Sequence, residues 1–230
     1  MRIGIVSDIH GNAPAMEAVA SRLEAEADAV VFLGDLVGYY GLVDRCVACL
    51  DSLPVVGGVR GNHDQVLLDC VAAGTVPTDA YTSSYGSALA RTLPHVLAPV
   101  AFLGTTQLTL RLELAGTVVA LFHGAPWDPL EGRVYPDFAE WDRFRVPEPS
   151  LLLLGHTHHP MVVEGDGFRV VNPGSVGQPR DRSGAAEYAV HDTTSGITTL
   201  SRIPYDANEV LADVAANDPD VPYLREVLCR

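Results

Sequence analysis

The chain has 230 residues and a formal net charge of −14 at pH 7, from 15 basic and 29 acidic side chains. This acidic excess disfavours a protein that coats nucleic-acid backbone or a polybasic membrane surface protein, because both depend on Lys and Arg. Hydrophobic residues make up 47% and charged residues 19%, which is typical of a folded globular protein rather than a disordered one.

The first part of the chain predicts strands that alternate with helices. Segments rich in Ile and Val predict strands over residues 2–7, 29–33 and 55–59. Helices are expected between them, one over residues 14–27 that begins at Pro14 and one over residues 42–53 that ends before Pro54. This alternation is typical of a parallel sheet covered by helices.

The remainder of the chain changes from this alternation to hairpins. Two helices are expected first, over residues 64–72 and 79–93. Strands then follow over residues 107–114, 117–122, 151–154, 161–164, 168–172, 186–191 and 197–202. A helical tail begins at Asn208 and is interrupted at Pro219 and Pro222. The whole order predicts an α/β fold, a four-layer αββα sandwich of two mixed β-sheets flanked by helices, in a single domain over residues 1–230.

One long connection, residues 124–150, carries several prolines and both tryptophans of the chain. Loops of this length are usually functional or disordered, and the aromatic side chains favour a functional loop. Trp127, Tyr135 and Trp141 are candidates to cover a site or to stack on a base. Whether this loop is a lid or an interface is left open.

The cysteines and the apolar segments bear on the compartment. Four scattered cysteines are too few for a disulfide framework, and Cys46 and Cys49 lie inside a predicted helix, where packing explains them. The N-terminal apolar stretch is too short for a signal peptide, and no run approaches the roughly 20 residues of a membrane span. We therefore expect a cytoplasmic protein.

Polar side chains cluster where the predicted strands end. The carboxyl ends of strands in an open α/β sheet meet at one edge, where such sheets bind ligands. Two Asp, one Asn and five His are expected there, namely Asp8, Asp35, Asn62, His10, His63, His123, His156 and His158. These groups are metal ligands, so a metal site is predicted. With His63 set aside, seven candidates exceed the needs of one catalytic ion, whereas two ions sharing a carboxylate would use them all.

Five short motifs, spread over about residues 3–177, resemble those of the calcineurin-like metallophosphoesterase superfamily. In order they are Asp8-Ile9-His10, Gly34-Asp35, Gly61-Asn62-His63-Asp64, His123-Gly124 and Gly155-His156-Thr157-His158. The resemblance implies the αββα sandwich and two metal ions. One ion would be held by Asp8, His10, Asp35 and His158, and the other by Asp35, Asn62, His123 and His156. His63 would face the substrate instead of binding metal.

The residues around these motifs are similar to the small prokaryotic phosphodiesterase branch of the superfamily. Protein phosphatases of the superfamily carry GDxVDRG after the second strand, where this chain has Gly34-Asp35-Leu36-Val37-Gly38-Tyr39. The second acidic residue, which supports the catalytic histidine in those enzymes, is Gly38 here, and this argues against a protein phosphatase. We expect Asp64 to orient His63 instead.

The resemblance implies dimetal-dependent hydrolysis of a small phosphodiester by a metal-bridging hydroxide, with His63 as the general acid. A phosphomonoesterase or a dinucleotide polyphosphate hydrolase on the same site is the alternative. The ions are expected to be divalent transition metals, with manganese favoured over iron, nickel or zinc. A non-catalytic scaffold is disfavoured because every motif is complete, and a nuclease acting on long polymers is disfavoured because no basic stripe is present.

Further residues are candidate substrate contacts outside the set of metal ligands. Arg60 and Arg180 are candidate phosphate contacts, with a purely structural role as the alternative. Ser175 lies in a glycine-rich loop, residues 174–177, that could present backbone N–H groups to phosphate or simply form a tight turn. Tyr39 is expected to line the mouth of the site. The expected partner is a small phosphoester, with no long nucleic acid and no membrane, and homo-oligomer formation is left open.

Overall fold

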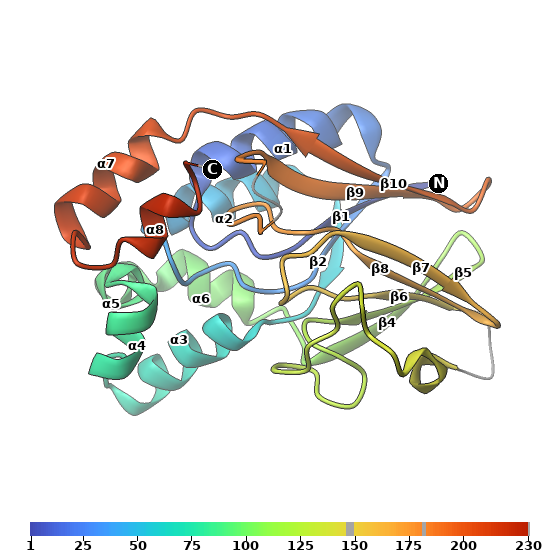
Figure 1. The fold of residues 1–230 in the computed structure, drawn as a ribbon, viewed down its shortest axis with the longest axis horizontal. Coiled ribbons are helices and arrows are strands. Elements are labelled where there is room, and N and C mark those ends of the chain that lie inside the picture. The colour runs from blue at the N-terminus through green and yellow to red at the C-terminus, as the bar shows by residue number, and fades with distance from the viewer. Residues whose placement is uncertain (146–149, 181–182, 230) are drawn as a thin grey trace.

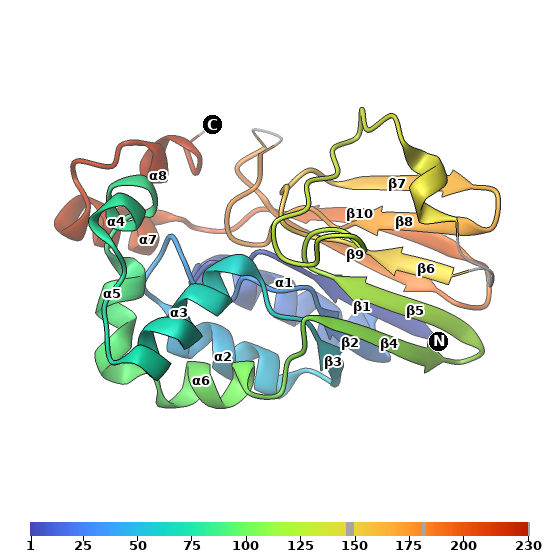
Figure 2. The ribbon, with the colours of Figure 1, turned by 90° about the horizontal axis from the view of Figure 1, so that it is seen from below.

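The computed structural model describes residues 1–145, 150–180 and 183–229. Two five-stranded mixed β-sheets pack face to face, with helices along the outer face of the first sheet and at one end of the sandwich (Figures 1 and 2). The predicted pair of mixed sheets flanked by helices is therefore confirmed.

The first sheet has the strand order β10-β9-β1-β2-β3. Its parallel part consists of β1 (Arg2–Val6), β2 (Ala29–Phe32) and β3 (Val55–Gly58), connected by α1 (Ala13–Glu26) and α2 (Val43–Ser52). The hairpin of β9 (Ala186–Asp192) and β10 (Ile197–Ile203) joins the other edge of β1 in antiparallel pairing. Strand–helix alternation thus produces the parallel part, as expected.

Alternating side chains along the strands build two separate layers of core. Val31 of β2 and Leu33, the residue after the strand, point between the sheets, while Val30 and Phe32 of β2 pack beneath the helices. Strands buried on both faces carry continuous apolar sequence for this reason.

The second sheet has the order β4-β5-β6-β8-β7. The pairs β5–β6 and β6–β8 are parallel, whereas β4–β5 and β7–β8 are antiparallel hairpins. The strands are β4 (Thr109–Leu114), β5 (Thr117–Phe122), β6 (Ser150–Leu153), β7 (Met161–Gly165) and β8 (Phe168–Asn172). Among the described residues, the outer face of this sheet is covered by residues 124–145, which include the short 3₁₀ helix η2 (Trp141–Phe144), and not by an α-helix.

The tryptophans of this connection are part of a core. Trp127 stacks on Phe138 and contacts Phe144, and this aromatic group packs on Leu152 and Val170 of the second sheet. The interpretation of both tryptophans as a cover over the site is therefore wrong. Residues 146–149 of the same predicted loop lie outside the described residues.

The helical part at one end of the sandwich differs from the prediction. The helix expected over residues 79–93 is divided at Gly86, whose φ of +83° is incompatible with a continuing right-handed helix. The helices here are α3 (Asn62–Ala73), α4 (Asp79–Tyr85), α5 (Ala88–Thr92), the 3₁₀ helix η1 (Leu93–His95) and α6 (Leu97–Leu103), which was not predicted. The C-terminal tail forms α7 (Asn208–Asn217) and α8 (Tyr223–Glu226). Across the described ranges, no helix combines the length and apolar character that crossing a membrane requires.

Candidate functional site

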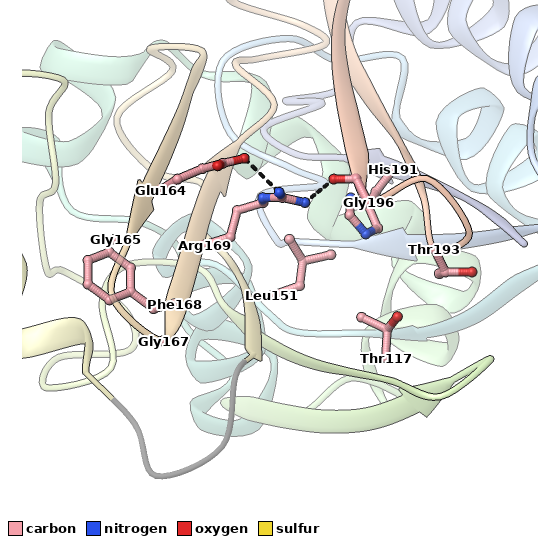
Figure 3. A pocket seen from close by; sticks show the side chains of 10 residues that line it. All are labelled: Thr117, Leu151, Glu164, Gly165, Gly167, Phe168, Arg169, His191, Thr193 and Gly196. Atoms are coloured by element: carbon pink, nitrogen blue, oxygen red, sulfur yellow. Dashed lines mark hydrogen bonds and ion pairs between the residues drawn. The ribbon is translucent and has the colours of Figure 1, made fainter.

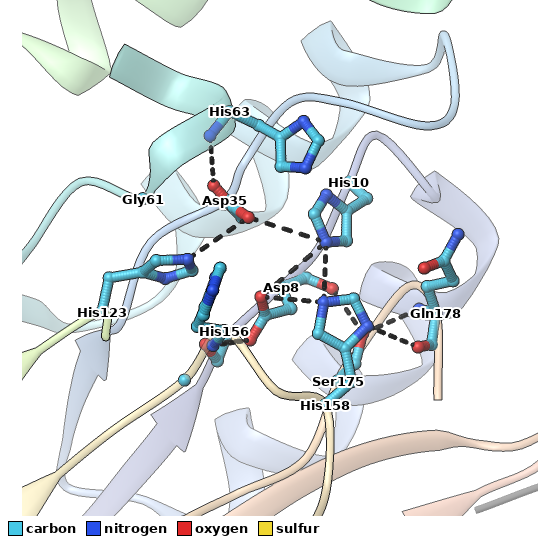
Figure 4. Close-up of polar contacts among 12 residues, drawn as sticks. Asp8, His10, Asp35, Gly61, His63, His123, His156, His158, Ser175 and Gln178 are labelled. Carbon is cyan, nitrogen blue, oxygen red and sulfur yellow. Dashed lines mark hydrogen bonds and ion pairs between the residues drawn. The ribbon is translucent and has the colours of Figure 1, made fainter. Parts of the chain in front are cut away.

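The candidate metal ligands converge at the carboxyl ends of the strands, and Figure 4 shows six of the seven, all except Asn62. His158 Nε2 lies 3.1 Å from both His10 Nε2 and Asp8 Oδ1. His123 Nε2 lies 3.1 Å from Asn62 Oδ1 and 3.4 Å from Asp35 Oδ2. We call this set the Asp/His cluster; its members are Asp8, His10, Asp35, Asn62, His123, His156 and His158.

The backbone of the cluster is strained. Six described residues other than glycine have positive φ, and five of them belong to the cluster: Asp8, His10, Asp35, His156 and His158, at +52° to +63°. Each costs on the order of 1–3 kcal/mol, which the surrounding structure must offset. The sharp turns aim these side chains back over the strand ends. Strain of this kind typically accompanies a functional site.

Backbone carbonyls fix the orientation of three imidazoles. The Nδ1–H groups of His10, His123 and His158 donate to the carbonyl oxygens of Val37, Leu33 and Gln178 at 2.9, 2.8 and 2.7 Å. A carbonyl can only accept, so the proton of each neutral ring lies on Nδ1 and the lone pair of Nε2 points into the cluster. This arrangement is the one that metal-ligating histidines use.

Two glycines let the chain segments approach closely enough to form the cluster. A β-carbon at Gly34, whose φ is +96°, would lie 2.8 Å from His123 Nδ1 and 2.5 Å from the backbone nitrogen of Gly61. A β-carbon at Gly61 would collide with the carboxylate of Asp35. Larger residues at either position would push Asp35 and His123 apart.

The donor set fits metal ions. Asp8 Oδ1 and His156 Nε2 are buried without a hydrogen-bond partner, and the facing Nε2 atoms of His10 and His158 bring two lone pairs together. Buried polar atoms left in this way are costly unless a further ligand satisfies them. Two groups have ligand atoms within 4.8 Å of one another: Asp8, His10 and His158, and Asp8, Asp35 and His123. Asp35 Oδ2 is also 3.8 Å from His10 Nε2, so Asp35 reaches both groups, as a bridging ligand must.

The titration behaviour of the cluster matches this chemistry. Burial opposes ionisation of Asp35, yet His123, His63 and His10 hold the pKa of its carboxyl well below the usual value. Burial lowers the pKa of His123, but the carboxylate of Asp35 outweighs it and raises that pKa to about 10. Burial and the neighbouring His123 lower the pKa of His156 to about 4. In the metal-free protein, protonated His123 therefore balances the carboxylates, a role that a bound cation would take over.

His63 lies beside the cluster and turns its ring to the pocket. Its backbone N–H donates to Asp35 Oδ1 at 2.9 Å, and its Nδ1 lies 2.5 Å from the hydroxyl of Tyr81. The ring also contacts His10 edge to face, at a centroid distance of 5.2 Å, and lies tilted against Tyr39 at 5.1 Å. Burial lowers the pKa of its imidazole.

The expectation that Asp64 orients the ring of His63 is wrong. The carboxylate of Asp64 accepts hydrogen bonds from the backbone N–H groups of Asp35, Leu36, Val37 and Gly61 at 2.8 to 3.2 Å. Asp64 therefore holds the loop that carries Asp35 against the start of α3. Tyr81, from α4, is the side chain bonded to His63.

A pocket of about 320 Å³ opens above the cluster, and we call it the site pocket. Its lining includes Tyr39 and Arg180, as predicted. The side chain of Arg180 also donates to Gln178 Oε1 at 3.1 Å. Four further residues line the pocket that were not predicted from the sequence: Tyr81, Tyr85, Glu131 and Arg133. Tyr81 and Tyr85 are four residues apart on one helix, a spacing that could have indicated a shared face. From the long connection, Tyr135 reaches the pocket.

Two predicted substrate contacts have structural roles instead. Arg60 donates to the carbonyl of Thr106 at 3.1 Å and is absent from the pocket lining. Ser175 is fully buried, and its hydroxyl donates to the carbonyl of Asp8 at 2.7 Å. The N–H groups of residues 174–177 bond to Asn172, Glu187, Ser7 and Asp8, so this loop is a brace for Asp8 and not a phosphate cradle.

Comparisons with known proteins agree with this geometry. Residues 1–196 match the family described as the calcineurin-like phosphoesterase superfamily domain. Uncharacterized protein MJ0912 of Methanocaldococcus jannaschii is 29% identical over 234 residues, covering 94% of this chain and 92% of that protein. The structure of a metallophosphoesterase from Sphaerobacter thermophilus is 26% identical, with a TM-score of 0.74 over 98% of this chain and 99% of the other. Hypothetical protein PH1004 from Pyrococcus horikoshii OT3 shares the fold, with 20% identity and a TM-score of 0.79 over 97% of each chain.

Proposed function

The chain belongs to the calcineurin-like phosphoesterase superfamily, and from that premise we propose that it hydrolyses a small phosphodiester with His63 as the general acid. The activity of the superfamily is hydrolysis that depends on two metal ions. The substrate class and the role of His63 are our own inferences, and they rest on the lining of the site pocket and on the position of the His63 ring.

The Asp/His cluster would hold two divalent ions. One would bind to Asp8, His10, Asp35 and His158, and the other to Asp35, Asn62, His123 and His156. When bound, such ions lower the pKa of a coordinated water and neutralise charge on phosphate oxygens. A mixture of imidazole nitrogen with carboxylate and amide oxygen suits manganese, which we favour over iron, nickel or zinc.

His63 has the position that a general acid needs. Its Nδ1 is engaged by Tyr81, so the nitrogen left to face a substrate is Nε2. A proton on Nε2 can pass to the departing alkoxide oxygen as the P–O bond breaks. Its place in the pocket lining, next to Asn62 and Tyr39, brings this proton close to the cluster without making His63 a ligand.

The observation that carries the choice of a diester is the aromatic wall beside His63. Tyr39, Tyr81 and Tyr85 surround its ring and offer apolar surface to an uncharged ester group. The charged side chains of the lining balance in number, because it contains two acidic residues, Asp35 and Glu131, and two basic residues, Arg133 and Arg180. A balanced pocket suits a singly charged diester better than a doubly charged monoester.

The two arginines favour one alternative, a dinucleotide polyphosphate. Arg133 and Arg180 could each contact a phosphate outside the cluster. A long polyanion is disfavoured in either case, because the chain carries a net charge of −14.

We further propose a cytoplasmic location. Cys46, Cys49, Cys70 and Cys229 are all free thiols in the structure. Free thiols are typical of proteins from a reducing compartment.

Hydrolysis assays with matched esters test the proposal. The protein, loaded in turn with Mn²⁺, Ni²⁺, Zn²⁺ or Mg²⁺, is supplied with bis(p-nitrophenyl) phosphate, p-nitrophenyl phosphate or diadenosine tetraphosphate. We expect the highest kcat/KM for the diester with Mn²⁺, and none in the Asp35→Asn variant. Preference for the monoester or the tetraphosphate would replace the diester proposal with the alternative, and no hydrolysis with any metal would refute the enzymatic role.

A further inference from the structure

One side chain beside His63, the candidate general acid, was not predicted from the sequence. Tyr81 lies on α4, 18 residues beyond His63, and its hydroxyl is 2.5 Å from His63 Nδ1. The hydroxyl is mostly buried, and burial raises the pKa of Tyr81 far above its ordinary value, so it remains protonated. It therefore can both donate and accept a hydrogen bond.

The other groups around the His63 ring contact it in other ways than by a hydrogen bond to Nδ1. His10, Tyr39 and Tyr85 meet it through ring contacts at centroid distances of 4.8 to 5.2 Å. Asp64 is turned to backbone N–H groups. A β-carbon at Gly38 would lie 3.2 Å from His63 Nδ1 and 2.8 Å from His10 Nδ1, so position 38 has no room for a side chain.

We propose that Tyr81 is a positioning residue that holds the His63 ring by its Nδ1 and keeps the transferable proton on Nε2. The inference rests on the proposed role of His63. When the ring is neutral, Tyr81 can donate to Nδ1, so that the ring proton lies on Nε2. When the ring is protonated, Nδ1–H donates to the tyrosine oxygen and Nε2–H faces the pocket. Transfer of the Nε2 proton to the alkoxide then leaves a neutral ring, still bonded to Tyr81 through Nδ1–H.

A hydroxyl partner at Nδ1 differs from a carboxylate partner in the tautomer of the neutral ring that it allows. A carboxylate only accepts, so it would hold the proton of a neutral ring on Nδ1, as the carbonyls do for His10, His123 and His158. Within the described residues, the ring assigned to proton transfer is bonded at Nδ1 to a hydroxyl, while three rings assigned to metal are bonded to carbonyls. The chemistry of the Nδ1 partner thus distinguishes His63 from these three rings.

A leaving-group series tests the inference in the Mn²⁺-loaded protein. Methyl aryl phosphodiesters whose phenols span a range of pKa are compared in wild type, Tyr81→Phe and His63→Ala. We expect Tyr81→Phe to lower kcat about tenfold for the most basic phenol but within about twofold for p-nitrophenol, where little protonation is needed. The dependence on leaving-group pKa should steepen toward that of His63→Ala. An equal loss for every phenol, or no loss, would overturn the inference.

Tyr188→Phe is the matched control, because it removes a tyrosine hydroxyl bonded to Glu26 on the helix-covered side of the first sheet. It should keep the wild-type dependence on the leaving group. If wild type prefers monoesters, the corresponding aryl phosphate series gives the same comparison, so failure of the diester proposal leaves this test intact.

Nitrogen-15 NMR of histidine side chains in the Zn²⁺-loaded protein provides a readout that needs no turnover. His63→Ala identifies the His63 signals by their loss. We expect Tyr81→Phe to shift the His63 Nδ1 resonance and Tyr188→Phe to leave it in place. An unchanged Nδ1 resonance in Tyr81→Phe would refute the positioning role even if the enzyme hydrolyses the diester as proposed.

Discussion

The two ends of the β-sandwich hold cavities of different character. At the end opposite the Asp/His cluster, a cavity of about 450 Å³ lies between Thr117, Leu151, Phe168, Arg169, His191 and Gly196 (Figure 3). It is larger than the site pocket, at about 320 Å³. We call it the far cavity.

Polar side chains of the far cavity pair with one another, apart from Arg169 Nε, which is buried without a hydrogen-bond partner. Arg169 pairs with Glu164 at 2.6 Å and donates to the carbonyl of Gly196, while His191 Nδ1 lies 2.8 Å from the hydroxyl of Thr198. Gly167 and Gly196 have positive φ in the turns there, as does Ala115 at +49° in the β4–β5 turn before Thr117. The Asp/His cluster instead strains Asp and His backbones and leaves buried ligand atoms unsatisfied. The cluster is therefore distinguished by its strained Asp and His residues and by metal-ligand atoms without hydrogen-bond partners, and not by the volume of its pocket.

The largest effect is expected from Asp35→Asn, because Asp35 reaches His10 and His123 and therefore both candidate metal groups. Turnover should fall by more than about 10³-fold, with loss of both ions. Inductively coupled plasma mass spectrometry gives the metal content, and it is measured together with kcat to check both expected losses. Full occupancy in the variant would rule out the shared ligand.

His63→Ala should lower kcat by about 10²- to 10³-fold while both ions remain bound. The ring contacts the cluster, but its Nδ1 is bonded to Tyr81. The same two measurements apply, and loss of metal in this variant would mean that His63 is itself a ligand.

Metal loading should release protons. At pH 7 the metal-free His123 is protonated, because its pKa is raised to about 10, and a ligand must give up that proton. Titration calorimetry in two buffers of different ionisation enthalpy should find about one proton released at pH 7 and weaker apparent metal affinity at lower pH. His123→Ala should abolish most of the release.

The same raised pKa sets the direction of a stability effect in the metal-free protein. A group whose pKa is higher in the folded state stabilises that state fully below its ordinary value, 6.5 for His123. This contribution is then lost as the pH rises through about 10. Denaturant titrations of metal-free wild type and His123→Ala across this range check the sign, since the variant should lack this loss.

The smallest effect is expected at the far cavity. Arg169→Gln removes the pair with Glu164, yet kcat and metal content should stay within about twofold of wild type. Assays run in parallel with the cluster variants provide the comparison. A large loss of turnover would show that the far cavity takes part in the reaction.

Much of the fold follows from local pattern. Runs of Ile and Val, with Pro14 and Pro54 at helix boundaries, predict the β1–α1–β2–α2–β3 order that the structure has. The helix expected over residues 79–93 is divided at Gly86, whose φ of +83° ends α4. A β-carbon at this position would lie 2.8 Å from Leu224 Cδ1, so the C-terminal tail also leaves no room for a side chain there.

The sequence alone was enough to bring the candidate ligands together, because strand ends meet at one edge whatever the loops do. Tertiary packing decided which groups these residues bond to. Asp64 bonds to the loop of Asp35, Ser175 braces Asp8, and Tyr81 takes the place beside His63. Each of these bonds joins segments that are 18 to 167 residues apart and depends on how helices and loops pack. Spacing along a chain reports which groups share an edge, whereas hydrogen bonding depends on atoms within about 3 Å, which only the folded chain defines.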